Sequence, residues 1–390
     1  MSTQIDQETS NTLEAPLASE ATARPRLFFV DHTRIFLTTL VIIHHLALTY
    51  IAGPWYYRET TYDLLTNLLL GLLVLFNQSF FMGCFFLISG YFTPGSYNRK
   101  GPKAFLRDRF LRLGLPLLIF TFILNPLIIY LGAGTPMPYG SFLLKYGVST
   151  IGTGPLWFVE ALLVFDCLYV FWRWLTRKRT TSTPATAISK PLTYRAILAF
   201  ILSLALITFL VRLWLPFGWT VPLVNLIPSN FPQYIGLFLI GLLATRHGWF
   251  QNIPTSMGKI GLGVALGSTL ILFLPALLSG WGTFAGGLHW QAFVYALWEA
   301  LMGVGMSMGL LVFFRQRMNR QGNLGKLLSR QAYAVYIIHA LILVCVAEYA
   351  LGSLHLYPLL KFALAMLISI PLCLVCAYLL RKLPLARKIL

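Results

Sequence analysis

Charge is scarce in this chain, and negative charge is the scarcer of the two signs. Asp and Glu together number 12 and Lys and Arg 30 among 390 residues, so 11% of the residues are charged while 57% are apolar. The mean hydropathy is +0.72. These values exclude a soluble two-domain protein of this length. They predict an all-α, polytopic integral membrane protein whose solvent is the lipid bilayer.

Cysteine is also sparse, and the first residues have little apolar character. The five cysteines all fall within apolar stretches, where the pair Cys373 and Cys376 has no second pair of ligands, so we expect helix packing and no metal site. Residues 1–23 are polar and lack an apolar core, which argues against a signal peptide. We expect them to form a disordered cytoplasmic tail.

Apolar runs dominate the rest of the chain. About ten of them are long enough to cross a bilayer as helices, at 35–53, 64–92, 110–131, 155–175, 194–215, 231–246, 259–280, 290–314, 332–351 and 358–381. Residues 24–390 therefore form one membrane domain of ten spans. The polar segment 177–191 is expected to be a flexible cytoplasmic linker between two halves of five helices.

The net charge of +18 invites a nucleic-acid interpretation, but the position of the basic residues argues against one. If the N-terminus is cytoplasmic, 26 Lys and Arg fall on the inner side of the ten spans and only Arg58, Lys145, Arg212 and Lys361 on the outer side. This distribution follows the positive-inside rule and places both termini in the cytoplasm. The basic charge reports topology, and no nucleic-acid partner is expected.

A short set of polar residues remains at membrane depth, where each needs a structural or chemical reason. It comprises His44, His45, Asn77, Gln78, Glu160, Asp166, Glu299, His339 and Glu348. His45 follows Arg34 after ten intervening residues, which puts its imidazole about 16 Å further into the bilayer along a helix. Adjacent His44 points about 100° away, so only one of the two can face a given site squarely.

Two arginines enter the third span from the cytoplasmic side. Arg109 and Arg112 are three residues apart, so they share a helix face and can offer two guanidiniums to one anion. Anchoring at the positive inner side is the simpler explanation, although both residues continue into the apolar run. A phosphate-rich cytoplasmic ligand such as coenzyme A would suit them.

Five motifs in order give the chain a family resemblance. They are Arg34 with His45, FFLISGYF at 85–92, Arg109 with Arg112 before LGLP, GPLWF at 154–158, and AYAVYIIHA at 332–340. The set resembles the membrane acyltransferase-3 family, and within it the branch linked to succinylation of periplasmic glucans. The resemblance extends over essentially the whole ten-span region.

The resemblance implies roles for the matching positions. His45 would be the catalytic residue with Arg34 as its paired motif residue, Arg109 and Arg112 would belong to the acyl-CoA site, and Trp157 would lie near the active cavity. His339 matches the ninth-span motif, and we expect it to have a structural role or to line the substrate cavity rather than to act directly in catalysis. Many members of the family continue into a periplasmic domain after the tenth span. Here we expect the acceptor to be handled by the membrane domain itself or by a separate periplasmic partner protein.

Two acids complete the expected site. Glu299 lies nearest the middle of the membrane and would orient His45 as a catalytic partner, while Glu160 lies nearer the outer face, where a sugar would enter. For both acids, a structural role between helices is the alternative. Aromatic residues at the outer ends of spans, Trp55 among them, are expected mostly in the interfacial belt.

The expected function is therefore a multi-pass O-acyltransferase of the inner (cytoplasmic) membrane. It would move an acetyl or succinyl group from cytoplasmic acyl-CoA, a co-substrate rather than a bound cofactor, to a hydroxyl of an extracytoplasmic carbohydrate or related acceptor. His45 would act as general base or carry the acyl group itself. One alternative is a proton-coupled transporter of a small polar substrate, because membrane-embedded His and Glu also serve as relays. A haem protein ligated by His45 and His339 is a third.

Overall fold

The chain is built from helices that follow one another with short connections. A computed structural model describes residues 26–51, 55–57, 59, 63–176, 190–221, 226–280 and 282–389. Within these ranges all regular structure is helical, apart from one isolated bridge between Val221 and Leu226. The expected disordered tail at 1–23 and residues 177–189 of the expected linker lie outside the described residues.

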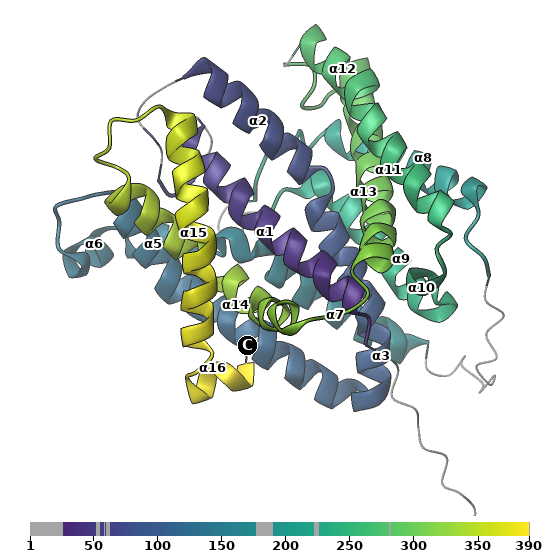
Figure 1. Ribbon diagram of the computed structural model, residues 1–390, viewed down its shortest axis with the longest axis horizontal. Coiled ribbons are helices and arrows are strands. Elements are labelled where there is room, and N and C mark those ends of the chain that lie inside the picture. Colours follow the sequence, from purple (N-terminus) through teal and green to yellow (C-terminus); the bar gives the residue numbers. More distant parts are fainter. Residues whose placement is uncertain are drawn as a thin grey trace, which may run out of the picture.

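The helices are labelled in chain order in Figure 1. Their bounds are α1 Phe28–Tyr50, α2 Leu64–Gln78, α3 Phe81–Arg109, α4 Leu115–Ile119, α5 Asn125–Gly132, α6 Tyr139–Tyr146, α7 Trp157–Leu175, α8 Tyr194–Arg212, α9 Phe231–His247, α10 Trp249–Asn252, α11 Thr255–Ser268, α12 Leu274–Ser279, α13 Trp290–Arg317, α14 Asn323–Cys345, α15 Pro358–Leu380 and α16 Pro384–Ile389. Four π-helical turns continue or join these helices, at Phe110–Gly114, Phe120–Leu124, Thr269–Phe273 and Val346–Ala350.

Eight helical segments of the described chain are long and apolar enough to cross a membrane. One of them, Leu64–Gly132, contains both the second and the third expected spans. The two are separated at Gly101, whose φ of 73° breaks the helix and lets the chain turn back. α9, with 17 residues, corresponds to the short sixth span. The ten expected stretches are thus helical, and the fold class is confirmed as an all-α polytopic membrane protein.

The third span is a series of short helical pieces. Two π turns separate α3, α4 and α5, and Pro116 and Pro126 stand near the starts of α4 and α5. Pro116 has no N–H to offer the carbonyl of Arg112 one turn earlier. The hydroxyl of Tyr333 on α14 donates to that carbonyl instead, at 2.6 Å. The broken helix is therefore tied to the ninth span where it enters the bundle.

Glycines allow the closest helix contact in the bundle, between α3 and α9. A Cβ on Gly90 would lie 2.2 Å from the carbonyl oxygen of Phe238, and one on Gly241 would lie 2.2 Å from that of Leu87. Small residues are how membrane helices bring their backbones together, since lipid offers no hydrophobic drive for association. This contact joins the two halves of the chain.

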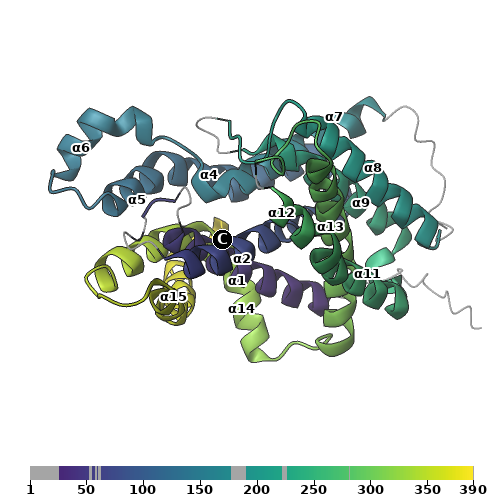
Figure 2. The same ribbon diagram turned by 90° about the horizontal axis from the view of Figure 1, so that it is seen from above.

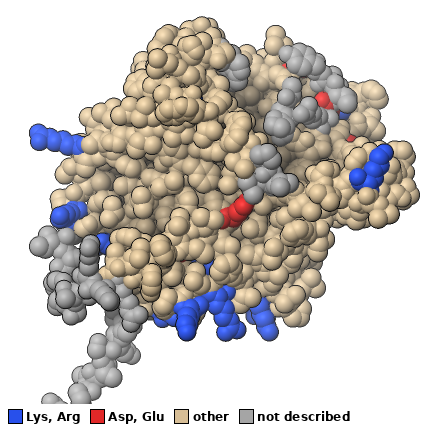
Figure 3. All heavy atoms as spheres, turned by 180° about the vertical axis from the view of Figure 1, so that it is seen from behind, with Lys and Arg blue, Asp and Glu red and all other residues tan. Residues whose placement is uncertain are grey.

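The two ends of the described chain lie on one side of the molecule. α1 begins and α16 ends at the lower side of Figure 1. Lys and Arg gather along the same edge in Figure 3. This arrangement agrees with the cytoplasmic side that the positive-inside rule assigns to both termini.

The centre of the bundle brings distant spans together. α14 packs between α1 and α15, while α13, the most buried of the candidate spans, packs against α8 and α11. Viewed from above, α5 and α6 project from one end of the molecule and α8 lies toward the other (Figure 2). The first and ninth spans, which carry His45 and His339, are therefore direct neighbours.

Candidate active site

Two imidazoles meet between α1 and α14. Nδ1 of His45 lies 3.1 Å from Nε2 of His339, and also 2.9 Å from the carbonyl oxygen of Val41 one turn earlier on α1. His339 is fully buried, and its Nδ1 lies 2.7 Å from the carbonyl oxygen of Tyr336. His45 is half-buried, and among the described residues its Nε2 has no hydrogen-bond partner. Each helix thus contributes one histidine to a hydrogen-bonded pair.

Aromatic rings cover His45. The ring of Trp55 stacks on it with 4.4 Å between centroids and 23° between planes. The indole N–H of Trp55 is buried and has no partner among the described residues. Trp55 is half-buried, and its ring lies on His45. Adjacent His44 points elsewhere, as the helical geometry requires, and packs on Phe81 at 5.0 Å.

The segment that carries Trp55 is anchored to the bundle on both sides of the site. Tyr56 donates a hydrogen bond to Oδ1 of Asn125, whose amide in turn donates to the carbonyl of Thr150 at 2.7 Å. Glu59 forms a buried ion pair with Lys361 of α15 at 2.8 Å. A buried carboxylate is retained at such a place only when a cation neutralises it. The pair fixes the outer segment above the histidines.

The GPLWF motif lies against the same site. The hydroxyl of Tyr336 donates to the carbonyl of Pro155, so the residue whose own carbonyl faces His339 also holds this motif. Gly154 has a φ of +47°, and a Cβ there would lie 2.1 Å from the hydroxyl of Tyr56. The motif needs glycine both for this backbone angle and for this close approach.

Trp157 and Glu160 begin α7 beside these residues. Trp157 stacks on Tyr234 of α9, with 5.4 Å between centroids and 27° between planes. Next to it, Phe158 contacts Tyr336 with 6.1 Å between centroids. Glu160 is half-buried, and its Oε2 accepts no hydrogen bond from the described residues. The start of α7 is thus joined to the histidine pair through Tyr336.

The sequence predicted that Glu299 would lie against His45. In the structure, Glu299 instead belongs to a second polar cluster. Its Oε2 lies 2.5 Å from Nη2 of Arg212, which is fully buried at the end of α8. Arg212 also donates to Asn230 at 3.3 Å, and its guanidinium lies 4.5 Å from the ring centroid of Tyr295. The contacts of His45 are instead with Val41, His339, His44 and Trp55. Burial explains this pairing. A carboxylate buried on α13 is costly unless a cation neutralises it, and Arg212 lies in direct contact with it.

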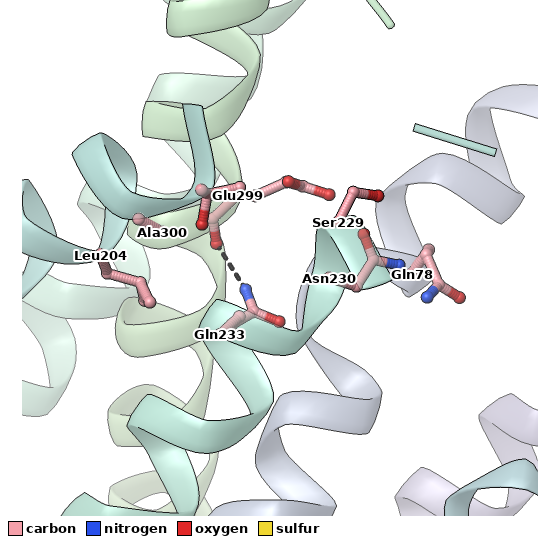
Figure 4. A pocket seen from close by; sticks show the side chains of 8 residues that line it. Gln78, Leu204, Ser229, Asn230, Gln233, Glu299 and Ala300 are labelled. Atoms are coloured by element: carbon pink, nitrogen blue, oxygen red, sulfur yellow. Dashed lines mark hydrogen bonds between the residues drawn. The ribbon is translucent and has the colours of Figure 1, made fainter. Parts of the chain in front are cut away.

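A small polar cavity adjoins this second cluster. It is lined by Gln78, Leu204, Thr208, Ser229, Asn230, Gln233, Glu299 and Ala300 (Figure 4). The amide of Gln233 donates to the carbonyls of Glu299 at 2.9 Å and Ser79 at 2.8 Å, which ties α9 to α13 and α2. The cavity volume of about 10 Å³ is at the lower limit for a single water molecule. It is too small for an acyl group or a sugar.

The two arginines of the third span have different carboxylate partners. Nε of Arg109 lies 3.0 Å from Oδ2 of Asp166, a fully buried residue of α7 that also accepts from Thr93 at 3.1 Å. Nε of Arg112 lies 3.1 Å from Asp108, and its side chain is 57% exposed. The π turn that begins at Phe110 separates the two arginines. Arg109 thus faces α7 and Arg112 faces the surface.

Arg34 stays at the cytoplasmic end of α1. It is exposed, and it lies eleven residues, about 16 Å along the helix, from His45. The structure therefore brings together His45, His339 and the GPLWF motif, but leaves Arg34 and Arg112 at the basic side and Glu299 in its own cluster. Sequence reasoning missed Tyr56, Asn125 and Tyr336. Asn125, a lone amide in an apolar run beside Pro126, was the detectable signal among them.

Comparison with known proteins agrees with this geometry. A family model described as an acyltransferase domain, the acyltransferase 3 family, matches residues 27–378. The chain belongs to this family and is a membrane acyltransferase. It is similar to glucans biosynthesis protein C of Salmonella paratyphi B, Salmonella enteritidis PT4 and Salmonella gallinarum, each 24% identical over 327 residues that cover 81% of this chain and 82% of the relative. No solved structure matches the chain.

Proposed function

We propose that this acyltransferase moves an acetyl or succinyl group from cytoplasmic acyl-CoA to a hydroxyl of an extracytoplasmic carbohydrate or related acceptor. The name of its relatives concerns glucans, which supports a carbohydrate acceptor. The single observation that carries the proposal is the unpartnered Nε2 of His45, which belongs to a half-buried imidazole in the interior of a membrane bundle. Use of a cytoplasmic donor on an outer acceptor places the enzyme in the cytoplasmic (inner) membrane.

The chemistry assigned to His45 balances in either of two ways. As general base, Nε2 takes the proton of the acceptor hydroxyl while that oxygen attacks the thioester carbonyl, the C–S bond breaks, and the proton passes to the departing thiolate. As nucleophile, Nε2 attacks the thioester carbonyl, the C–S bond breaks, and coenzyme A leaves as a thiolate while the ring carries the acyl group. The acceptor hydroxyl then attacks that acyl group, the N–C bond breaks, and the hydroxyl proton passes to the freed Nε2 and from there to the thiolate. Both routes need an Nε2 lone pair that faces the substrate.

The remaining expected residues divide between donor and acceptor. Exposed Arg112 and Arg34 are suited to the phosphates of acyl-CoA at the basic side, because a guanidinium binds phosphate through two parallel hydrogen bonds. Arg109, bound to Asp166, holds the helix that presents Arg112. Trp157 and Glu160 are suited to a sugar, the first as an aromatic face and the second through its unpartnered Oε2. A separate periplasmic protein would present or receive the acceptor.

One observation favours the transporter alternative. A hydrogen-bonded pair of histidines at membrane depth is also the arrangement of a proton relay in a coupled transporter. Such a transporter would move its substrate without cleaving a thioester. The consumption of the donor therefore separates the two functions.

The decisive experiment measures thiol release by the full chain in lipid nanodiscs. Acetyl-CoA and succinyl-CoA are supplied with and without candidate glucans, and wild type is compared with His45→Ala. His44→Ala is the matched control, because it removes the neighbouring imidazole that packs on Phe81. We expect release by wild type and by His44→Ala, and a loss of about 10²- to 10⁴-fold in His45→Ala. No release from folded wild type with any donor and acceptor would favour the transporter.

A further inference from the structure

The hydrogen bonds of the histidine pair determine where its protons lie. A backbone carbonyl can only accept, so Nδ1 of His339, 2.7 Å from the carbonyl of Tyr336, carries the proton of that ring. Nε2 of neutral His339 is then an acceptor. It lies 3.1 Å from Nδ1 of His45, which must therefore be the donor.

The same argument applies to His45. Its Nδ1 faces two acceptors, the carbonyl of Val41 at 2.9 Å and Nε2 of His339 at 3.1 Å. With the proton on Nδ1, the lone pair of the neutral ring is on Nε2, the nitrogen that the chemistry requires. The carbonyl of Val41 lies on α1, the same helix as His45, and also accepts a backbone hydrogen bond of that helix. His339 is the acceptor that a second helix, α14, provides.

We propose that His339 is the positioning residue of His45, a role different from the substrate-binding role expected from the sequence. Together with the carbonyl of Val41, it favours the tautomer with the lone pair on Nε2, and from the second helix it holds the ring against Trp55. When His45 takes a proton at Nε2, its Nδ1–H keeps both acceptors, and the second histidine adds no charge to the membrane interior. This inference rests on the proposed function in assigning the reaction to His45.

The surroundings of His339 fit this role. The residue is fully buried, and the residue that binds its Nδ1, Tyr336, is itself fixed by its hydroxyl on Pro155. The ring centroids of His45 and His339 are 4.9 Å apart, and those of His45 and Trp55 are 4.4 Å apart. His45 is therefore held from two sides, and the GPLWF motif contributes through Tyr336 without touching His45.

Two substitutions of His339 test the role. Gln can place an acceptor oxygen near the position of Nε2, whereas Leu has similar size and no acceptor. We expect His339→Leu to lower kcat for thiol release by about 10- to 100-fold with KM for acyl-CoA within about twofold, the usual size of a lost orienting partner. His339→Gln should stay within about threefold of wild-type kcat. Equal melting temperatures for the two variants establish that the difference is not one of folding.

Three outcomes would overturn the proposal: wild-type kcat in His339→Leu, an equal loss in both variants, or a change confined to KM for the acceptor, which would return His339 to substrate binding. A second measurement is independent of activity. In ¹⁵N-histidine spectra of the nanodisc protein, we expect His45 with its proton on Nδ1 in wild type and in His339→Gln. In His339→Leu, where the carbonyl of Val41 is the acceptor that stays, we expect a weaker preference for that tautomer. If wild type releases no thiol but shows this tautomer, the proposed function fails while the positioning contact stands.

Discussion

Two of the buried polar clusters in the described part of the bundle are built in opposite ways. Around Arg212 and Glu299, full charges of opposite sign neutralise each other at 2.5 Å. Around His45 and His339, neutral rings are joined in a row that ends on the carbonyl of Tyr336. In the first cluster the two charges neutralise each other. In the second, Nε2 of His45 has no hydrogen-bond partner among the described residues. In this bundle, the paired charges of Arg212 and Glu299 are suited to packing, and the histidine pair is the cluster for which we propose chemistry.

Removal of one partner of the ion pair should have the largest effect. Arg212→Met leaves Glu299 buried without its cation, which we expect to lower the free energy of unfolding by about 3 to 5 kcal/mol. The double variant Arg212→Met with Glu299→Leu should recover most of this loss, because it buries no unpaired charge. Unfolding of each variant in nanodiscs or detergent measures both values.

The activity of the same double variant tests whether the Arg212–Glu299 cluster is only structural. If the cluster is structural, the folded double variant releases thiol from acyl-CoA at a rate close to that of wild type. A double variant that is as stable as wild type but inactive would place Glu299 in the catalytic machinery, as the sequence suggested.

The second prediction applies the same rule to the two arginines of the third span. Arg109→Ala leaves fully buried Asp166 with only the hydroxyl of Thr93, and we expect a loss of about 1 to 3 kcal/mol in the free energy of unfolding. Arg112→Ala removes a side chain that is 57% exposed, so its stability should change little. Its expected effect is a higher KM for acyl-CoA. Thermal unfolding and donor saturation curves distinguish the two variants.

The control for this prediction is Asp166→Asn in the Arg109→Ala background. It removes the buried charge, so it should restore part of the lost stability. If Arg109→Ala is as stable as wild type and only its KM for acyl-CoA rises, both arginines contact the donor and the shared face inferred from their spacing is the better description.

The approximate depth of each polar residue in the membrane was predictable from the sequence. Which helix each of these residues faces was not. His45 and His339 lie 17 and 16 residues after the starts of α1 and α14, hence at about the same depth, because both helices begin on the basic side. Hydropathy and the positive-inside rule are enough for that inference. They say nothing of which helices are neighbours, so Glu299 was assigned to His45 rather than to Arg212. Arg212 was itself counted among the four basic residues of the outer side, although it lies within the expected span 194–215.

The segment after α1 shows a second limit. Trp55 follows an apolar span, which is the ordinary position of an interfacial tryptophan. Its actual position depends on Glu59, which pairs with Lys361 about three hundred residues away and holds the segment down. No local pattern contains such a contact. The spacing from Arg34, by contrast, is local to one helix, and it selected His45 over His44 in agreement with the geometry of the pair.

The smallest effect is expected at Trp55. A substitution there tests whether the ring that stacks on His45 contributes to the activity proposed for the histidine pair. Aromatic stacking contributes about 0.5 to 1.5 kcal/mol beyond area burial. Trp55→Ala should therefore lower kcat/KM for the acceptor by about 2- to 10-fold, while Trp55→Phe, which keeps a ring on His45, should lose less. Trp290→Ala is the matched control, since that indole is 58% exposed at the start of α13. Equal rates for Trp55→Ala and Trp290→Ala would reduce Trp55 to a packing residue and leave the positioning of His45 to α14 alone.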